Sequence, residues 1–242
     1  MSHVVADAIA DILARKPRVH FICAVNNEEV YRTIFLRSLL HNRYASLTKV
    51  IGATSAAQAF NENVVKHPAD GITVLVHQDV FLPPYWTDRM EAIFDNTPFG
   101  VAGCVGANES GFFAEVYGNR TEYLDFQIEQ LPARVDSLDE LILVFPSSTP
   151  IRLHTELGWH MYGADASAQA KQLGHSALVV RNPVVHCCNR QNYDPSQDTS
   201  FVASARKFYA LHKTATKTTM AYLDRDGNLR FPEGQFVPAE SA

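Results

Sequence analysis

The chain has 242 residues, of which 46% are hydrophobic and 19% charged, and its formal net charge is −5. This balance suits one globular domain, and it gives no overall positive field that would draw the chain to nucleic acid or to an anionic membrane. No apolar run approaches the roughly 18 residues of a membrane-spanning helix, and no basic segment precedes an apolar stretch at the N-terminus. We therefore expect neither a membrane span nor a signal peptide.

The first 105 residues alternate between short apolar runs and helical patterns. Asn26 and Asn27, followed by two acids, favour a helix start, and Ser55 and Gln58 have the spacing of a capping box. This alternation predicts a mostly parallel sheet covered by helices. The expected strands are 18–25, 49–52, 72–76 and 99–105, and the expected helices are 4–16, 26 to about 39, 55 to about 67, and 83–96.

After Gly106 the pattern changes to short strands, and the segment from Thr121 to Gln130 is ambiguous. No linker rich in Pro, Gly or Ser separates the two halves, so we predict one α/β domain over 1–242, with halves at about 18–105 and 106–215 and a loose tail at 233–242. The expected strands are 111–117, 134–136, 141–145, 177–180 and 183–186, and a hairpin turn is expected at 224–228. The expected helices are 163–173 and 199–213, and the second should bury Phe201, Ala205, Phe208 and Leu211.

Four cysteines give information about the redox environment. Cys187 and Cys188 are adjacent, so their Cα atoms lie about 3.8 Å apart, closer than disulfide geometry usually allows. Cys23 and Cys104 lie in apolar runs and are expected to fill the core. This pattern predicts a reduced, cytoplasmic protein.

The run from Ile72 to Val76 has the uniform apolar character of a strand that is buried on both faces. His77, Gln78 and Asp79 follow it directly. Open α/β sheets bind ligands beyond the carboxyl ends of their strands, so we favour a functional role for Asp79 over a simple strand end. His77 is two residues away and can share that site.

Several common nucleotide and hydrolase motifs are missing from the sequence. No GxGxxG follows the first strand, and neither a GxxxxGK[ST] loop nor a GxSxG elbow occurs. What remains is a dispersed set of polar residues at expected strand ends. Asp and His with open coordination positions suit a divalent cation that also binds phosphates, and a separate carboxylate could act as a base. The set comprises Asn26 to Glu28, Asn61, His77, Asp79, Asp136, Asp139, Glu140, Asp165 and His186.

The order and spacing of seven short segments resemble a GT-A glycosyltransferase, and more narrowly the family-2-like group that includes a streptomycin-biosynthesis protein. Together the segments cover residues 18 to about 190. They are Cys23–Tyr31, Ala59–Asn61, Val76–Val80, Val101–Gly103, Val135–Glu140, Trp159–Asp165 and Val185–His186.

The resemblance implies a GT-A (nucleotide-diphospho-sugar transferase) fold and a role for each matching residue. The half at 18–105 would bind a nucleotide sugar and the half at 106–215 an acceptor. His77 replaces the first acid of the family's DxD motif, which leaves Asp79, with His186, to hold Mn²⁺ or Mg²⁺. Implied nucleotide contacts are Ala24, Val25, Asn26, Glu28, Asn61, His77 and Gln78, and implied acceptor-side residues are Asp139, Glu140, Trp159 and Tyr162.

The resemblance also implies that Asp165 is the base of an inverting transfer, although Ala164 stands where the family has a Glu. Other roles remain open for these residues. Asp165 could cap the helix that begins near Gly163, and Asn26 and Asn27 could be helix caps without a nucleotide contact. His160 and His186 could be hydrogen-bonded core residues, and the acids at 136–140 could form a solvated turn. Trp159 and Tyr162 could stack on a sugar or anchor the packing.

Three functions are therefore compatible with the sequence. The first is a metal-assisted glycosyltransferase that moves a sugar from a nucleotide-sugar donor to an acceptor hydroxyl. The second is a catalytically degenerate protein of the same fold that binds a nucleotide or a partner. The replacement of two of the family's acids by His77 and Ala164 would fit that function. The third is a metal-dependent phosphoesterase that uses His77, Asp79 and His186, although such enzymes usually need more metal ligands.

Overall fold

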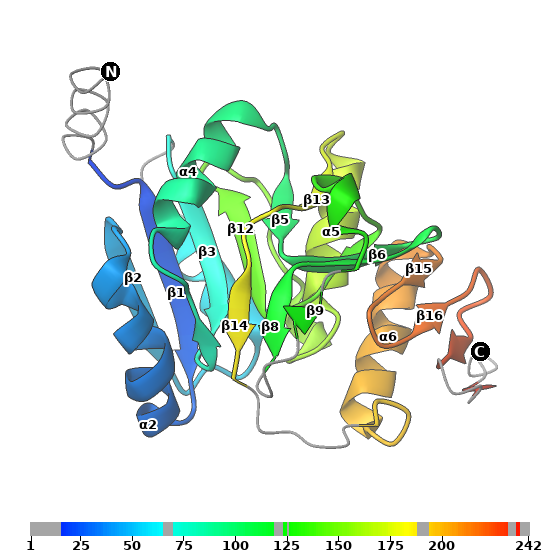
Figure 1. Cartoon of the computed structure of the whole chain (residues 1–242). Helices are drawn as coiled ribbons and strands as arrows, with labels where there is room; N and C mark the ends of the chain where they lie inside the picture. Colours follow the sequence, from blue (N-terminus) through cyan, green and yellow to red (C-terminus); the bar gives the residue numbers. More distant parts are fainter. Residues whose placement is uncertain are drawn as a thin grey trace.

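The computed structural model describes residues 16–64, 70–118, 123–124, 126–187, 194–231 and 236–237. The helix predicted at 4–16 and most of the tail at 233–242 lie outside these residues. A seven-stranded sheet forms the centre of the molecule, in the order β10-β13-β5-β12-β3-β1-β2 (Figure 1). Its strands are β1 (Val19–Val25), β2 (Ser46–Ile51), β3 (Ile72–His77), β5 (Val101–Gly103), β10 (Ala133–Arg134), β12 (Ile142–Pro146) and β13 (Ala177–Val179).

The central sheet is mixed but mostly parallel. β1 pairs in parallel with β2 and β3, and β13 pairs in parallel with β5. β12 runs antiparallel to both β3 and β5, so these two strands share one direction. The predicted parallel direction of the first four strands is confirmed. The sequence pattern did not predict that β12 separates β3 from β5.

The helix starts follow local capping chemistry. The Asn27 side chain accepts hydrogen bonds from the backbone N–H groups of Glu29 and Val30, and Ser55 accepts from that of Gln58, as the sequence predicted. The helix expected to reach residue 67 instead ends at Asn61. The helices are α2 (Glu28–Val30), which continues as a π-helix (Tyr31–Leu36), α3 (Ala56–Asn61), α4 (Trp86–Asn96), α5 (Tyr162–Gln172) and α6 (Thr199–His212).

Three smaller sheets are formed mainly by strands of the second half. The strands expected at 99–105 and 111–117 each divide in two, and that at 134–136 is replaced by β10 and β11, because the chain passes from one sheet to another at each break. One sheet has β11 (Ser137–Leu138), β6 (Val105–Asn108) and β7 (Gly111–Ala114), and another has β4 (Val80–Phe81), β14 (Val184–His186), β8 (Val116–Gly118) and β9 (Tyr123–Leu124). The last has β15 (Thr216–Lys217), β16 (Tyr222–Leu223), β17 (Leu229–Arg230) and β18 (Phe236–Val237).

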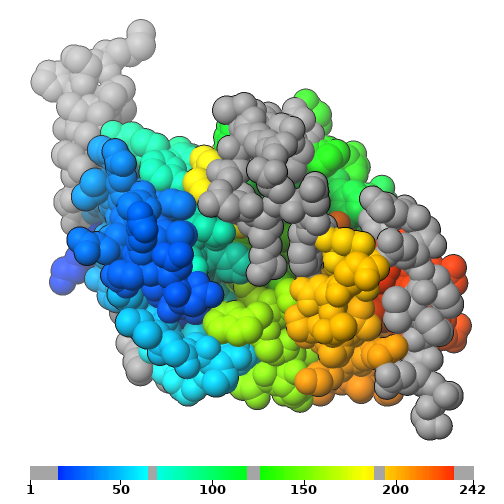
Figure 2. Space-filling view, turned by 90° about the horizontal axis from the view of Figure 1, so that it is seen from below, coloured from blue at the N-terminus to red at the C-terminus, as the bar shows by residue number. Residues whose placement is uncertain are grey.

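Alternating residues of the central strands build two cores, one on each face of the sheet. Phe21 and Trp86 of α4 belong to the core on one face, and Ile22 and Ala166 of α5 belong to the core on the other. The helices α4 and α5 accordingly lie on opposite faces of the sheet (Figure 1). Cys23 and Cys104 are buried core residues, as predicted. Viewed from below, α6 lies on the opposite side of the molecule from the first strands and helices (Figure 2).

A third core joins α6 to the C-terminal strands. Phe201, Ala205 and Phe208 are buried there, but the prediction that Leu211 is also buried was wrong, because its exposed fraction is 38%. The buried stripe advances by four, three and four residues along the helix and so continues to His212, whose side chain is 3% exposed.

The burial of α6 leads to a stability prediction. Phe208→Ala should destabilise the fold by about 3–5 kcal/mol, because it removes a fully buried ring. Leu211→Ala, the matched change on the exposed side of the same helix, should cost less than about 1 kcal/mol. Urea unfolding monitored by circular dichroism measures both, and equal losses would contradict the observed orientation of α6.

Candidate active site

The ends of β1 and β3 lie side by side. Ala24 pairs with His77 in the register of the two strands. The Gln78 side-chain oxygen accepts hydrogen bonds from the backbone N–H groups of Asn26 and Asn27, at 3.1 and 3.0 Å, and its amide nitrogen donates to the Asn26 side chain. The sequence-predicted nucleotide loop and the His-Gln-Asp segment are therefore adjacent.

His77, Asp79 and His186 converge at this edge. His186 is opposite Val80 in the pairing of β14 with β4, and the Cys187 backbone N–H donates to the Asp79 carbonyl oxygen at 2.8 Å. The Asp79 carboxylate oxygens lie 3.5 Å from His186 Nε2 and 3.9 Å from His77 Nδ1. Each of the three side chains is partly exposed, so a ligand can reach them from solvent.

The charges of Asp79 and His186 stabilise each other. Burial alone would raise the pKa of Asp79, but the hydrogen bond and charge of His186 outweigh it and hold this pKa below its ordinary value. Burial alone would lower the pKa of His186, but Asp79 raises it above 6.5. Each group therefore favours the charged form of the other, which widens the pH range over which both are ionised.

The same residues fit a divalent cation. One nitrogen from each histidine and one carboxylate oxygen lie within 4.8 Å of one another. A set of two imidazoles and one carboxylate suits transition-metal ions, Mn²⁺ and Zn²⁺ among them, better than Mg²⁺, which prefers oxygen ligands. The solvent-facing side leaves coordination positions for water or phosphate oxygens.

A second group of polar residues lies beside His77. The Tyr162 hydroxyl is 2.7 Å from His77 Nε2 and donates to the Glu140 carbonyl oxygen at 2.9 Å. The His77 backbone N–H donates to the Leu141 carbonyl oxygen at 3.0 Å. Burial, together with the charge of Asp139, raises the pKa of Glu140 to about 8, against the opposing effect of backbone N–H groups at the start of α5.

Two other predicted site residues have structural partners. The Asn61 side-chain amide accepts a hydrogen bond from the Leu153 N–H at 2.9 Å and donates one to the Leu153 carbonyl at 2.7 Å, and Glu28 pairs with Lys49.

The remaining predicted residues differ in burial and contacts. The Tyr162 ring is buried, which fits a packing anchor, whereas Trp159 is 46% exposed. Val25 is buried at the end of β1, and Asp139 accepts from Thr219 Oγ1 at 2.8 Å.

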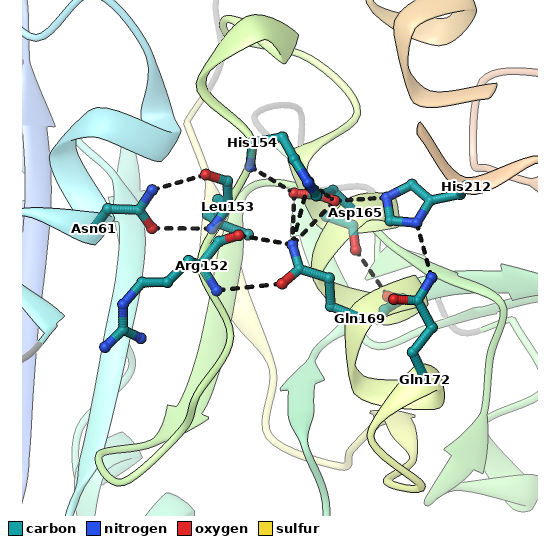
Figure 3. A network of polar contacts seen from close by, with 10 residues as sticks. Asn61, Arg152, Leu153, His154, Asp165, Gln169, Gln172 and His212 are labelled. Atoms are coloured by element: carbon teal, nitrogen blue, oxygen red, sulfur yellow. Dashed lines mark hydrogen bonds and ion pairs between the residues drawn. The ribbon is translucent and has the colours of Figure 1, made fainter. Parts of the chain in front are cut away.

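Asp165 occupies a different environment from the Asp79 cluster. It lies in the first turn of α5 and does not cap it, because the N-cap position belongs to Met161. Its side chain is fully buried and accepts hydrogen bonds from His154, His212 and Gln169 (Figure 3). Burial would raise its pKa, but these donors together lower it. The role of Asp165 as a base remains a prediction that this enclosed position does not favour.

Sequence reasoning did not identify His154 or His212 as members of a cluster. They lie 11 and 47 residues from Asp165 along the chain. The one available signal was the buried stripe of α6, whose spacing reaches His212 rather than Leu211.

The mixed sheet, with its polar cluster beyond the end of β3, is the arrangement of a GT-A glycosyltransferase. A family profile described as "Glycosyltransferase like family" matches residues 20–216, and the chain belongs to that family. No curated protein matches the chain.

Three solved structures align with most of this chain. The structure of GalNAc-T7 with UDP, GalNAc and Mn²⁺ aligns with a TM-score of 0.50 and 10% identity, over 79% of this chain and 47% of that one. This chain thus spans about half the length of that protein. Residues 1–349 of S. aureus TarS align with a TM-score of 0.49 and 10% identity, over 81% and 73% of the two chains. A197 from STIV aligns with a TM-score of 0.43 and 9% identity, over 93% and 95%.

Among the described residues, no helix has the length and apolar character needed to cross a membrane.

The Asp79–His186 pair leads to a pH prediction for the metal-free protein. Because His186 has a raised pKa in the folded state, its stabilising contribution should be complete below about pH 6.5 and be lost as the pH rises through that raised value. The lowered pKa of Asp79 makes its contribution disappear only as the pH falls below about 4. An NMR titration of the His186 ring should give a midpoint above 6.5 that falls in Asp79→Asn, whereas an unchanged midpoint would contradict the pairing.

Proposed function

We propose that the protein is an inverting glycosyltransferase that moves a sugar from a nucleotide-sugar donor to an acceptor hydroxyl with the help of a divalent cation. One observation carries this proposal. In a chain of this family, His77, Asp79 and His186 converge beside the loop at Asn26 to Glu28, at the carboxyl end of the central strands. This is where open α/β sheets bind ligands.

His77, Asp79 and His186 would hold the cation, and Mn²⁺ suits their ligand atoms better than Mg²⁺. Bound there, the cation would neutralise the negative charge on the diphosphate leaving group. The Tyr162 hydroxyl contacts His77 Nε2 and so fixes the ring orientation, which leaves Nδ1 on the side of Asp79. Such contacts commonly orient metal-ligating histidines.

The loop after β1 would receive the nucleotide. Gln78 ties the Asn26 and Asn27 backbone to the end of β3, so the nucleotide loop and the cation ligands are held together. The predicted contacts at Ala24, Val25 and Glu28 lie in the same segment. Asn61 would act indirectly, because its amide is occupied by Leu153.

We assign the base to Glu140 in preference to Asp165. The backbone carbonyl of Glu140 accepts from the Tyr162 hydroxyl next to the cluster, and the pKa of its side-chain carboxyl, about 8, is close to the value that suits a base at neutral pH. Both carboxylates accept hydrogen bonds from protein N–H groups, but Asp165 is fully buried and has a lowered pKa, which makes it the weaker base.

The reaction then balances as a single displacement. The acceptor oxygen forms a bond to the anomeric carbon of the donor while the bond from that carbon to the diphosphate oxygen breaks. The acceptor hydroxyl proton passes to the Glu140 carboxylate, and the nucleoside diphosphate leaves with the electron pair. Attack from the face opposite the leaving group inverts the anomeric carbon.

The second candidate is a binding protein without turnover. The replacement of an acid by His77 and the enclosed position of Asp165 favour it. It shares the nucleotide site with the first proposal but lacks the chemical step. A phosphoesterase is less well supported, because the cluster provides only one carboxylate and two imidazoles.

Nucleotide binding tests the donor site. A matching nucleoside diphosphate at about 100 times its Kd, with Mn²⁺, should stabilise the protein by about 2.7 kcal/mol. For a chain of this size the midpoint of thermal unfolding should rise by roughly 5–10 °C. Asp79→Asn should abolish the rise, because it removes the only carboxylate among the cation ligands.

Asp88→Asn removes the α4 partner of Arg43 in a partly exposed ion pair; it is the matched control and should keep the full rise. The panel should include nucleoside diphosphates and sugar nucleotides, each with Mn²⁺, with Mg²⁺ and without metal. No rise with any of them would overturn the donor site. Phosphate release from a simple ester without a nucleotide would favour the phosphoesterase.

The assignment of the base predicts opposite results for two isosteric variants. Glu140→Gln should reduce kcat by about 10²–10⁴-fold while leaving the nucleotide-induced thermal shift unchanged. In the wild type, kcat/KM should rise with pH up to about 8 and then level off, because only the carboxylate can accept the proton.

Asp165→Asn should mainly lower the unfolding midpoint. If folded Asp165→Asn instead loses transfer while Glu140→Gln keeps it, Asp165 is the base. If both variants bind the nucleotide and the wild type transfers no sugar at any pH, the binding protein is the better description.

A further inference from the structure

A second cluster of metal-ligating side chains lies around Asp165, away from the proposed catalytic residues. His154 precedes the short 3-10 helix at Thr155–Leu157, Asp165 is on α5, and His212 is the last residue of α6. His154 Nδ1 and His212 Nε2 lie 2.8 and 2.7 Å from the same carboxylate oxygen, Oδ1 (Figure 3). Side chains from three different segments therefore meet at one carboxylate oxygen.

The second carboxylate oxygen has its own partner. Asp165 Oδ2 accepts from the His154 backbone N–H at 2.9 Å, and the Gln169 amide lies 3.2 Å from both oxygens. The carboxylate is thus held in one orientation, with Oδ1 turned toward both imidazoles. Two imidazole nitrogens and one carboxylate oxygen are thus brought together, and these are donor atoms that a transition-metal ion can share.

We propose that His154 Nδ1, Asp165 Oδ1 and His212 Nε2 form a structural site for a transition-metal ion, with Zn²⁺ the best fit. The three ligand atoms lie within 4.8 Å of one another. Zn²⁺ binds such nitrogen and oxygen atoms at about 2.0–2.2 Å in a tetrahedron, which places ligand atoms about 3.3 Å apart. To reach that spacing, the distance from each ring nitrogen to Oδ1 would have to lengthen by about half an ångström.

The surroundings hold the His212 ring in place. Its side chain is 3% exposed and packs against the Phe208 ring, with centroids 4.7 Å apart. Gln172 lies 3.2 Å from His212 Nδ1. With its amide oxygen turned to that nitrogen, Gln172 accepts the ring proton and leaves Nε2 free to bind metal, the usual arrangement for a ligating histidine.

A water molecule would have to supply the fourth ligand of a bound ion. The His154 side chain is 35% exposed, so water can complete the coordination from that side. Asn61 fixes the backbone next to His154 through its two hydrogen bonds to Leu153 (Figure 3). The ion would therefore join the His154 loop and the end of α6 to α5, and this role is independent of the proposed transferase activity.

Metal binding should be measured in a background that lacks the first cluster, Asp79→Asn/His186→Gln. After dialysis against chelator, Zn²⁺ titration by calorimetry should show one equivalent in this background. Co²⁺ in place of Zn²⁺ should give the visible absorption of a tetrahedral site. Adding His154→Gln, a change at a partly exposed position, should weaken Zn²⁺ binding by at least about 10-fold and abolish the Co²⁺ band.

His212→Gln should have the same effect, and His41→Gln, at an exposed histidine outside both clusters, is the matched control and should have none. If His212→Gln fails to fold, His154→Gln still decides the result. The proposal is overturned if the background protein binds no Zn²⁺. It is also overturned if His154→Gln leaves both the affinity and the Co²⁺ spectrum unchanged.

Discussion

The antiparallel insertion of β12 between β3 and β5 is the constraint on which the candidate active site depends. Because β12 runs opposite to β3, its first residues lie at the end of β3, where Leu141 accepts the His77 backbone N–H. Asp139 and Glu140 are thereby placed beside His77 and Asp79, about 60 residues earlier in the chain. The two cores bury β3 on both faces, which fixes the position of the polar residues that follow it.

The first turn of α5 connects the two clusters. Tyr162 reaches His77 on one side, and Asp165, three residues later, holds His154 and His212 on the other. Gly163 lies between them because a Cβ there would be 2.3 Å from the Leu138 carbonyl oxygen, a distance that no side chain tolerates. Close approach of α5 to β11 thus sets the geometry of both sites.

Local patterns predicted the elements that depend on local forces. The apolar runs of β1 and β3 and the caps at Asn27 and Ser55 are confirmed, since burial on both faces and side-chain capping leave clear sequence signals. The breaks between β5 and β6 and between β7 and β8 left no such signal, because they depend on which sheet each segment joins. Leu211 was misassigned by one position along α6, where the buried stripe continues to His212.

The sequence by itself determined the family, the mostly parallel order of the first half and the placement of His77 to Asp79 at a strand end, since all three depend on short segments in fixed order. Only the tertiary structure decided which distant residues meet. It joined His186 to Asp79 through the pairing of β14 with β4, and it enclosed Asp165 between His154 and His212. The physical reason is that a carboxylate's exposure and pKa depend on the partners that packing brings to it, and those partners leave no pattern in the adjacent sequence.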